Sequence, residues 1–228
     1  MSERDDEKRA VAYAAVDACV PASVRSIGLG TGTTAYWAIE RVAELVAAGH
    51  EITAVATSVE SEEHCRARGI PLTGLLEGPP IEVAIDGADE IAPDFAAIKG
   101  GGGALFRERA VALAADVFVI IVTAEKLVPQ LGAFPLPVEV VPFSARYVAR
   151  EIGRLGVPLA LRERNGKTFV TDNGNNILDC RFGSIGDPAG LDARLRAIHG
   201  VVTTGLFTGI VSRLFVGSPT GVYESAAR

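Results

Sequence analysis

Cysteine and long apolar runs are scarce in this sequence. The three cysteines, Cys19, Cys65 and Cys180, are isolated, and no Cys-x-x-Cys pair occurs. This spacing excludes a disulfide framework and gives no zinc-knuckle pattern. No apolar run approaches the roughly 18 residues that a membrane span requires, and the charged segment 1–9 is not followed by a signal-peptide core. We therefore expect a soluble protein of a reducing compartment, the cytoplasm, with no membrane partner.

Basic and aromatic side chains are also in short supply. The 228 residues include 22 Lys and Arg against 28 Asp and Glu, a formal net charge of −6. An acidic surface repels phosphate groups, so no nucleic-acid partner is expected. Aromatic residues make up only 6% of a chain that is 48% hydrophobic. The core must be built mainly from Val, Ile, Leu and Ala, which suits parallel strands covered by helices on both faces.

Strands and helices alternate in the first half of the chain. Helical spacing predicts helices between the apolar stretches, and the first helix covers 5–19. The predicted strands are 23–27, 52–57, 81–85 and 117–122. This order predicts an α/β fold with a doubly wound, mostly parallel sheet. Segment 214–216 is expected to return as one more strand of that sheet.

The pattern changes near residue 131. Pro135, Pro137 and Pro142 fall within eight residues, which argues against an interior strand. The elements predicted beyond them are helices 144–155 and 188–198 and strands 159–161, 168–171 and 176–180. Asn173-Gly174 predicts a hairpin between the last two strands. We therefore expect two domains, one of residues 1–130 with 205–228 and a smaller α+β domain of residues 131–204.

A glycine-rich stretch, residues 28–34, lies where the first strand runs into a helix. Glycine lets the backbone approach a ligand, and the N–H groups of a helix start attract anions. The stretch fits a loose G-x-G-x-x-A, but Thr57-Ser58 stands where a dinucleotide site needs a carboxylate. No G-x-x-x-x-G-K-[ST] motif is present. Phosphate binding is the favoured interpretation, and a dinucleotide site or a purely structural turn are the alternatives.

Carboxylates follow the third strand, in Asp86-Gly87-Ala88-Asp89-Glu90. Ligands of doubly wound sheets bind beyond the carboxyl ends of the strands. The same residue types also form solvated turns, so both interpretations stand. A magnesium site is a minor alternative because no dedicated set of further oxygen ligands is present. None of the three histidines has a ligand-spaced partner, so no metal site is expected.

Lys99 precedes four consecutive glycines, residues 100–103. Such a run costs conformational entropy, which is easiest to explain if the backbone wraps closely around a ligand. Lys99 would supply a positive charge for an oxyanion or a phosphate. Glu108 lies one turn into the next helix, between Arg107 and Arg109. It either points into the cleft as a catalytic group or belongs to a solvated face.

Taken together, these segments resemble ribose-5-phosphate isomerase of the A type. Each match is weak alone, but the set occurs in family order and at family spacing over nearly the whole chain. The matching stretches are Gly28–Thr34 (GLGTGTT), Asp86–Glu90 (DGADE), Lys99–Gly102 (KGGG), Ala104–Glu108 (ALFRE), Phe134–Val140 (FPLPVEV), Thr171–Leu178 (TDNGNNIL) and Gly200–Phe207 (GVVTTGLF). Segments 57–60 and 208–211 depart from the family pattern. These departures affect what the resemblance implies about subunit contacts and substrate reach, and not what it implies about the reaction.

The resemblance implies reversible isomerisation of ribose 5-phosphate and ribulose 5-phosphate, a step of the non-oxidative pentose phosphate pathway, without metal or organic cofactor. It also implies a Rossmann-like domain carrying a smaller ferredoxin-like one, and a homodimer or homotetramer.

The resemblance also assigns roles to residues by their motif position. Glu108 would be the proton-shuttling base, and Asp86 and Lys99 further catalytic groups. The substrate contacts that it implies are Thr31, Gly32, Thr33, Thr34, Asp86, Gly87, Ala88, Asp89, Lys99, Gly100, Gly101, Gly102, Lys126 and, over a shorter alignment, Lys8. Thr31–Thr34 with a lysine is the favoured phosphate site.

Two other functions are compatible with this fold class. A sugar-phosphate-binding sensor module would bind without turnover, but it normally adjoins a DNA-binding domain, and nothing basic flanks either end of this sequence. A coenzyme A transferase-like enzyme would use a glutamate as nucleophile and form a covalent thioester. Exchange of the sugar C2 proton with solvent would instead favour the isomerase.

Overall fold

The computed structural model describes residues 3–226, which form two compact units. The first unit contains the described residues up to Ala88, residues Arg107–Lys126 and the residues from Ile210 onward. The second contains Asp89–Phe106 and Leu127–Gly209. The main difference from the expected domain boundaries is segment 89–106, which belongs to the second unit. It does so because its strand β5 (Ala97–Ile98) pairs both with β4 (Glu90–Ile91) and with distant β13 (Leu206–Phe207) in a small sheet.

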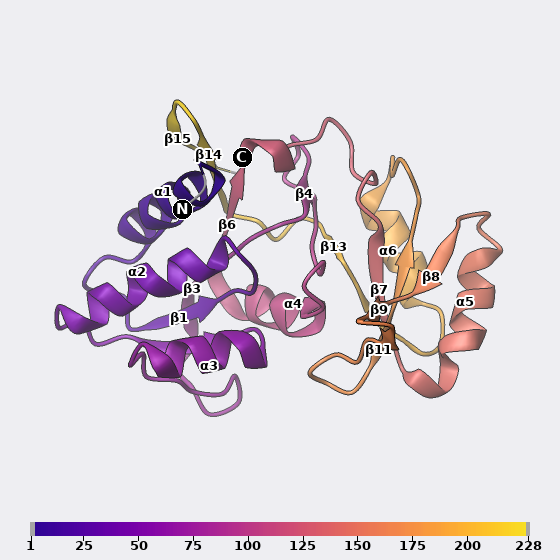
Figure 1. Ribbon diagram of the computed structural model, residues 1–228, viewed down its shortest axis with the longest axis horizontal. Coiled ribbons are helices and arrows are strands. Elements are labelled where there is room, and N and C mark those ends of the chain that lie inside the picture. The colour runs from indigo at the N-terminus through magenta and orange to yellow at the C-terminus, as the bar shows by residue number, and fades with distance from the viewer. Residues whose placement is uncertain (1–2, 227–228) are drawn as a thin grey trace. The chain divides into compact units, whose positions relative to one another are not determined.

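A six-stranded sheet forms the centre of the first unit, in the order β15-β14-β6-β3-β1-β2 (Figure 1). The strands are β1 (Ser26–Leu29), β2 (Thr53–Ala56), β3 (Ile81–Asp86), β6 (Ala115–Thr123), β14 (Arg213–Ser218) and β15 (Gly221–Ala226). All neighbours pair in parallel except β15, an antiparallel edge strand that the sequence pattern did not indicate. The predicted parallel sheet and the return of segment 214–216 to it are confirmed.

Helices cover both faces of this sheet. They are α1 (Glu3–Cys19), α2 (Ala35–Ala47), α3 (Val59–Ala67) and α4 (Leu105–Ala114), and the 3-10 helix η1 (Ala124–Lys126) follows β6. Figure 1 shows α1 and α2 on one side of β1 and β3, and α3 on the other. Val16 of α1 and Ile39 of α2 belong to one core with Ile27 and Ile85 of the sheet. Helix α4 packs so closely that a Cβ at Gly28 would lie 2.4 Å from Val111 Cγ1.

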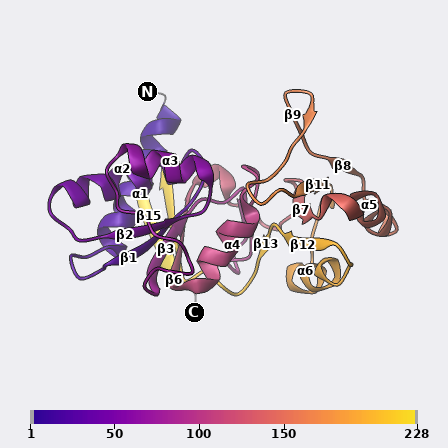
Figure 2. The same cartoon turned by 90° about the horizontal axis from the view of Figure 1, so that it is seen from below.

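The second unit is built on a four-stranded antiparallel sheet in the order β12-β7-β11-β8. Its elements are β7 (Leu136–Val140), η2 (Pro142–Ser144), α5 (Ala145–Gly153), β8 (Leu159–Leu161), β11 (Asn176–Cys180), α6 (Pro188–Arg196) and β12 (Val201–Thr204). Alternate residues of β7 share a core with residues of both helices. The order βαββαβ is that of a ferredoxin-like fold. Figure 2 shows strand β9 (Glu163–Arg164) on an arm that extends away from α6.

The strand at Pro137 shows that the proline argument against an interior strand was wrong. Strand β7 lies between β12 and β11. The carbonyl of Pro137 accepts a hydrogen bond from the N–H of Gly205, one residue past the end of β12. In antiparallel pairing, the nitrogen of a residue points to the same side as its carbonyl. The missing N–H of Pro137 therefore faces a place where the β12 ladder has ended, and no ladder hydrogen bond is lost.

The hairpin predicted at Asn173-Gly174 was also wrong. The hairpin lies at Asn165-Gly166, which joins β9 (Glu163–Arg164) to β10 (Lys167–Thr168) with positive φ angles of 55° and 72°. Gly174 has a positive φ as well, but Thr171 caps its turn by accepting hydrogen bonds from the N–H groups of two asparagines, 173 and 175. Both dipeptides meet the backbone requirement of a tight turn, so the dipeptide alone does not identify which one joins paired strands.

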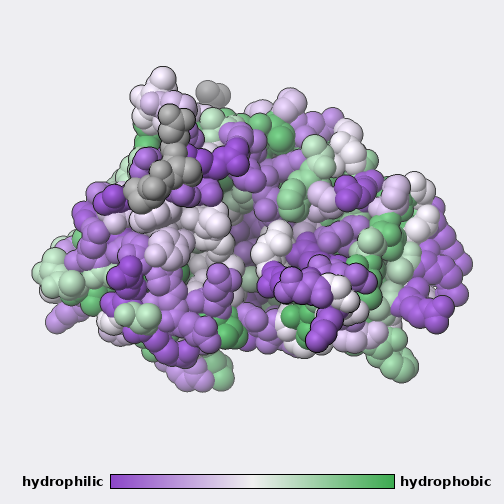
Figure 3. All heavy atoms as spheres, viewed as in Figure 1, coloured by the Kyte–Doolittle hydropathy of each residue, from purple (hydrophilic) through white to green (hydrophobic). Residues whose placement is uncertain are grey.

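One face of the molecule can be followed by its hydropathy in Figure 3. Hydrophilic residues cover most of the face seen in Figure 3, with apolar side chains scattered among them. Within residues 3–226, no helix combines the length and the apolar composition needed to cross a membrane.

The three thiols are buried in the cores, and this makes stability sensitive to alkaline pH. Burial raises the pKa of Cys19 and Cys65 to about 11 and that of Cys180 to about 12. An unfolded thiol ionises near pH ~8.5. The stabilising contribution is therefore fully present below that pH and is lost as pH rises through the folded pKa values. We expect each thiol to lower the free energy of unfolding by about 1.4 kcal/mol per pH unit between about pH 9 and 11.

Urea titrations across this pH range test the effect of the thiols. Removing one thiol with Cys180→Ala should make the decline in the free energy of unfolding shallower. The comparison uses slopes, so the cavity that this substitution leaves does not affect it. An unchanged slope would show that Cys180 is not responsible.

Candidate active site

Three neighbouring strands of the first unit end in residues that the sequence analysis selected. Strand β1 leads into Thr31–Thr34, β3 ends at Asp86, and β6 is followed by η1, which ends at Lys126. These strands lie side by side in the order β6-β3-β1 and run parallel. Their carboxyl ends therefore meet at one edge, the usual ligand position in such sheets.

Asp86 is fixed at this edge by backbone hydrogen bonds. Its side chain is buried, and Oδ1 accepts from the N–H groups of Thr31 at 3.1 Å and Gly87 at 2.7 Å. Gly30 lies directly against it, because a Cβ there would be 2.0 Å from Asp86 Oδ1. The glycine of the β1 loop is therefore needed for the carboxylate to occupy this place.

Glu108 lies in the first turn of α4 and is buried as well. Glu108 and Asp86 line the same crevice of the first unit, which in this structure is too narrow to hold a water molecule. Its other walls come from the ends of β1, β2 and β3 and from the next turn of α4, including Gly28, Gly30, Thr57, Ala84 and Val111. Of the two interpretations of Glu108, the structure excludes the solvated face.

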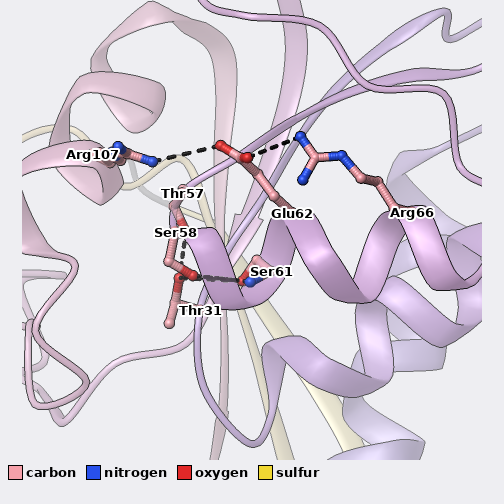
Figure 4. Close-up of polar contacts among 7 residues, drawn as sticks. All are labelled: Thr31, Thr57, Ser58, Ser61, Glu62, Arg66 and Arg107. Atoms are coloured by element: carbon pink, nitrogen blue, oxygen red, sulfur yellow. Dashed lines mark hydrogen bonds and ion pairs between the residues drawn. The ribbon is translucent and has the colours of Figure 1, made fainter. Parts of the chain in front are cut away.

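Four hydroxyl groups hold the β1 loop from the side of α3 (Figure 4). Thr31 Oγ1 lies 2.7 Å from Thr57 Oγ1 and donates to Ser58 Oγ at 2.8 Å. Ser58 Oγ donates to Ser61 Oγ at 3.1 Å, and Ser61 Oγ donates to the carbonyl of Gly30 at 2.7 Å. The loop is thus bound on its N–H side by Asp86 and on its carbonyl side by Ser61.

The sequence analysis gave Ser58 and Ser61 no role at this site. Thr57-Ser58 entered it as the place where a dinucleotide-binding carboxylate is missing and as part of a segment that departs from the family pattern. The sequence signal that could have placed Thr57-Ser58 at this site was its position directly after β2, the strand next to β1. Figure 4 also shows Glu62 between two arginines. Its carboxylate oxygens lie 3.5 Å from Arg107 Nη1 and 3.2 Å from Arg66 Nη2. The ion pair with Arg107 links α3 to the residue before Glu108.

The remaining predicted residues of the first unit come from four segments: the loop before α2, helix α1, the residues after β3 and η1. Gly32 and Thr33 are exposed and Thr34 is partly buried at the start of α2. An ion pair joins Arg4 of α1 to Glu125 of η1. Lys8 is one helical turn from Arg4, and Lys126 follows Glu125, so the ion pair brings the parts of the chain that carry both lysines together. Gly87 and Ala88 directly follow Asp86.

Lys99 and its glycines belong to the second unit. Lys99 is buried, and its Nζ lies 5.5 Å from the centre of the Phe207 ring. Gly100 and Gly103 have positive φ angles of 96° and 93°, which explains the glycines at these two positions. Asp89 Oδ2 accepts a hydrogen bond from the N–H of Gly101 at 2.8 Å. The structure therefore uses Asp89 to hold the glycine loop.

Each unit carries its own reactive groups. The first has two buried carboxylates in one crevice, beside a loop whose outer residues can offer N–H and hydroxyl donors to an anion. The second has a buried ammonium group next to the glycine loop. Carboxylates of this kind transfer protons, and an ammonium group stabilises developing negative charge. Within residues 3–226 no cluster of three or more His, Cys, Asp or Glu side chains is arranged to hold a metal ion.

The close contact between Gly30 and Asp86 predicts the effect of adding a single methyl group. Gly30→Ala would push its Cβ into the carboxylate of Asp86. Displacing a catalytic group by about 1 Å can cost about 100-fold in rate, and we expect a loss of that size in kcat. The control is Gly153→Ala on α5, where a Cβ meets nothing within 4 Å. Steady-state kinetics with circular dichroism check this, and wild-type kcat in a folded Gly30→Ala variant would contradict it.

Known proteins resemble this chain over most of its length. The family model described as Ribose 5-phosphate isomerase A (phosphoriboisomerase A) matches residues 53–221. A protein of Parvibaculum lavamentivorans named ribose-5-phosphate isomerase A is 44% identical over 224 residues, covering 95% of this chain and 96% of that protein.

Solved structures agree with these sequence matches. A ribose 5-phosphate isomerase from Plasmodium falciparum has a TM-score of 0.94 at 34% identity, covering 97% of this chain and 98% of that one. A D-ribose-5-phosphate isomerase in complex with phospho-erythronic acid has a TM-score of 0.94 at 32% identity, covering 99% of this chain and all of that one.

Proposed function

Because the chain belongs to the ribose-5-phosphate isomerase A family, we propose that Glu108 is the base that carries a proton between C2 and C1 of the sugar. The enzyme interconverts the aldose ribose 5-phosphate and the ketose ribulose 5-phosphate. This reaction removes a proton from one carbon and returns it to the next, and a single carboxylate can do both. The observation that carries the proposal is that Glu108 is buried and lines one crevice with Asp86.

Lys99 is proposed to stabilise the intermediate. Loss of the C2 proton gives an enediolate, whose negative charge is spread over O1 and O2. A buried ammonium group and aligned backbone N–H groups stabilise such an oxyanion strongly, because little water competes with them. Gly100, Gly101 and Gly102 form the backbone next to Lys99, in which the N–H of Gly101 is held by Asp89.

Asp86 is proposed to open the cyclic sugar, which must precede isomerisation. Ring opening moves a proton from O1 to the ring oxygen, and a carboxylate can accept and return it. Asp86 Oδ1 accepts hydrogen bonds from the N–H groups of Thr31 and Gly87, and these bonds fix the orientation of the side chain.

The phosphate of the substrate is proposed to bind at Thr31–Thr34. This loop precedes α2 and its outer residues are exposed, and an ion pair between Arg4 and Glu125 joins the two segments that carry Lys8 and Lys126. Helix N-termini and lysines both attract phosphate. Binding energy from this remote group orients the sugar carbons for reaction. Gly87, Ala88 and Asp89 complete the proposed substrate contacts, with Asp89 acting through the loop that it holds.

Several properties of the whole molecule are further proposals. We propose a homodimer or homotetramer in the cytoplasm, acting without metal or organic cofactor. A mass of two or four times 23.8 kDa in sedimentation would support the oligomer, and a monomer would contradict it.

The function is tested directly by incubating the protein with ribose 5-phosphate after dialysis against a chelator. Ketose should form at an undiminished rate, and in D₂O the C2 position should exchange its proton with solvent. Binding without turnover would favour the sensor module instead. A covalent glutamyl thioester formed with an acyl-coenzyme A would favour a transferase.

A further inference from the structure

The glycine loop of the second unit, residues 99–103, is held from its carbonyl side by one arginine. Arg162 Nη1 donates to the carbonyl oxygens of Gly100 at 2.8 Å and Gly101 at 3.1 Å. The backbone of Arg162 is itself fixed, because its N–H donates to Ile177 and its carbonyl accepts from Phe169. Arg162 thus connects a rigid part of the ferredoxin-like unit to the segment that carries Lys99.

The guanidinium of Arg162 is in turn held by Asp179 of β11. Nε donates to Oδ2 at 2.9 Å and Nη2 donates to Oδ1 at 2.5 Å, a bidentate pair. The Arg162 side chain is only 12% exposed. A planar guanidinium bound on two of its nitrogens by one carboxylate has its third nitrogen set in direction. Nη1 therefore reaches the two glycine carbonyls from a fixed position.

These hydrogen bonds determine where the loop's N–H groups point. A trans peptide group places its N–H opposite its carbonyl. The carbonyls of Gly100 and Gly101 belong to the same peptide groups as the N–H groups of Gly101 and Gly102. The first of these N–H groups donates to Asp89. A cation on the carbonyl side also polarises both peptide groups and strengthens their N–H donors.

We propose that Arg162, held by Asp179, is a positioning residue for the isomerisation. It orients the peptide groups of residues 100–102, and thereby Lys99, for stabilising the enediolate. Four consecutive glycines have no side chains to fix their conformation, so the loop depends on hydrogen bonds, of which the one within it, from the N–H of Gly103 to the carbonyl of Gly100, leaves the Gly101 carbonyl to Arg162. This inference rests on the role proposed above for Lys99 and its loop.

Arg164 provides a matched control within the same unit. Its Nη2 donates to the carbonyl of Gly102 at 3.3 Å, and its guanidinium lies 4.5 Å from the centre of the Phe169 ring. It has the same charge and contacts the same loop, but it is exposed and makes a single, longer hydrogen bond to it.

The experiment compares Arg162→Lys, Asp179→Asn and Arg164→Lys in the full-length enzyme. The readouts are kcat, KM for ribose 5-phosphate, the inhibition constant of phospho-erythronic acid and the melting temperature. Phospho-erythronic acid carries a planar carboxylate where the enediolate forms, so it probes the oriented donors. We expect Arg162→Lys to lower kcat about 30-fold and weaken the inhibitor at least about 10-fold, with KM within about threefold of wild type.

Arg164→Lys should stay within about threefold of wild type in both kcat and inhibition. Asp179→Asn should shift kcat and inhibition in the same direction as Arg162→Lys. If Arg162→Lys does not fold, the result for Asp179→Asn tests the proposal in its place. Unchanged kcat in a folded variant of Arg162 or Asp179 would overturn the proposal. The proposal would also be overturned if Arg164→Lys lost as much kcat as Arg162→Lys. A fall in kcat of the Arg162 or Asp179 variant without weaker inhibition by phospho-erythronic acid would overturn it too. An inactive wild-type enzyme, or full activity without Lys99, would instead contradict the proposed function.

Discussion

Exchanging Glu108 for glutamine is expected to lower kcat by about 10³-fold, the middle of the about 10²–10⁴-fold range of general acid–base catalysis. Glutamine keeps the size and shape of the side chain, but its amide cannot accept the C2 proton. The surroundings of Glu108 are buried, so water has little access to take over as base. KM for ribose 5-phosphate should stay within a few-fold, because the phosphate contacts are unchanged.

Ketose formation measures the loss, and deuterium exchange at C2 in D₂O locates it. Exchange and turnover should fall together, since the same group carries both proton transfers. Glu63→Gln is the matched control, because Glu63 is an exposed glutamate of α3. Near-wild-type turnover in a folded Glu108→Gln variant would rule out Glu108 as the base.

Lys99→Met is expected to lower kcat about 10²–10³-fold, the usual effect of removing one oxyanion donor. Methionine is unbranched and fills much of the space of the lysine chain, so the burial of this position against Phe207 is retained. Only the charge is lost. Because the enediolate is more negative at O1 and O2 than the substrate, the charge stabilises the transition state more than the ground state.

The division of the effect between kcat and KM decides the role of Lys99. A loss in kcat fits stabilisation of the intermediate, whereas a change confined to KM would reduce Lys99 to a binding residue. Lys167→Met, at an exposed lysine of β10, should leave both constants unchanged. If Lys99→Met binds phospho-erythronic acid more weakly and Lys167→Met does not, Lys99 is assigned to stabilising the enediolate.

The parallel sheet was predictable because its signals are local. Strands such as β3 and β6 contain short apolar runs, and helical periodicity fills the gaps between them. Pro137 was misjudged because the cost of a missing N–H depends on the neighbouring strand, and β12 lies more than 60 residues further on. Asn173-Gly174 was misjudged for a similar reason, since a turn sequence does not specify which strands pair.

The residues of the candidate site also fall into two groups, those that local sequence signals identify and those that only distant contacts identify. Asp86 and Glu108 stand next to recognisable elements, so a strand end and a helix start located them. Ser61 and Arg162 carry no motif of their own. Their importance comes from contacts with Gly30 and Gly100, which lie 31 and 62 residues away in the chain. Single-sequence patterns do not contain such pairings.

The position of β14 in the sheet has a consequence for biosynthesis. This strand packs beside β6, yet it comes from residues 213–218 of a 228-residue chain. A nascent polypeptide therefore leaves this edge of β6 uncovered until residues 124–212 have also been made. Exposed strand edges are prone to wrong association. This edge is therefore where we expect the first unit to be most open to wrong pairing during synthesis.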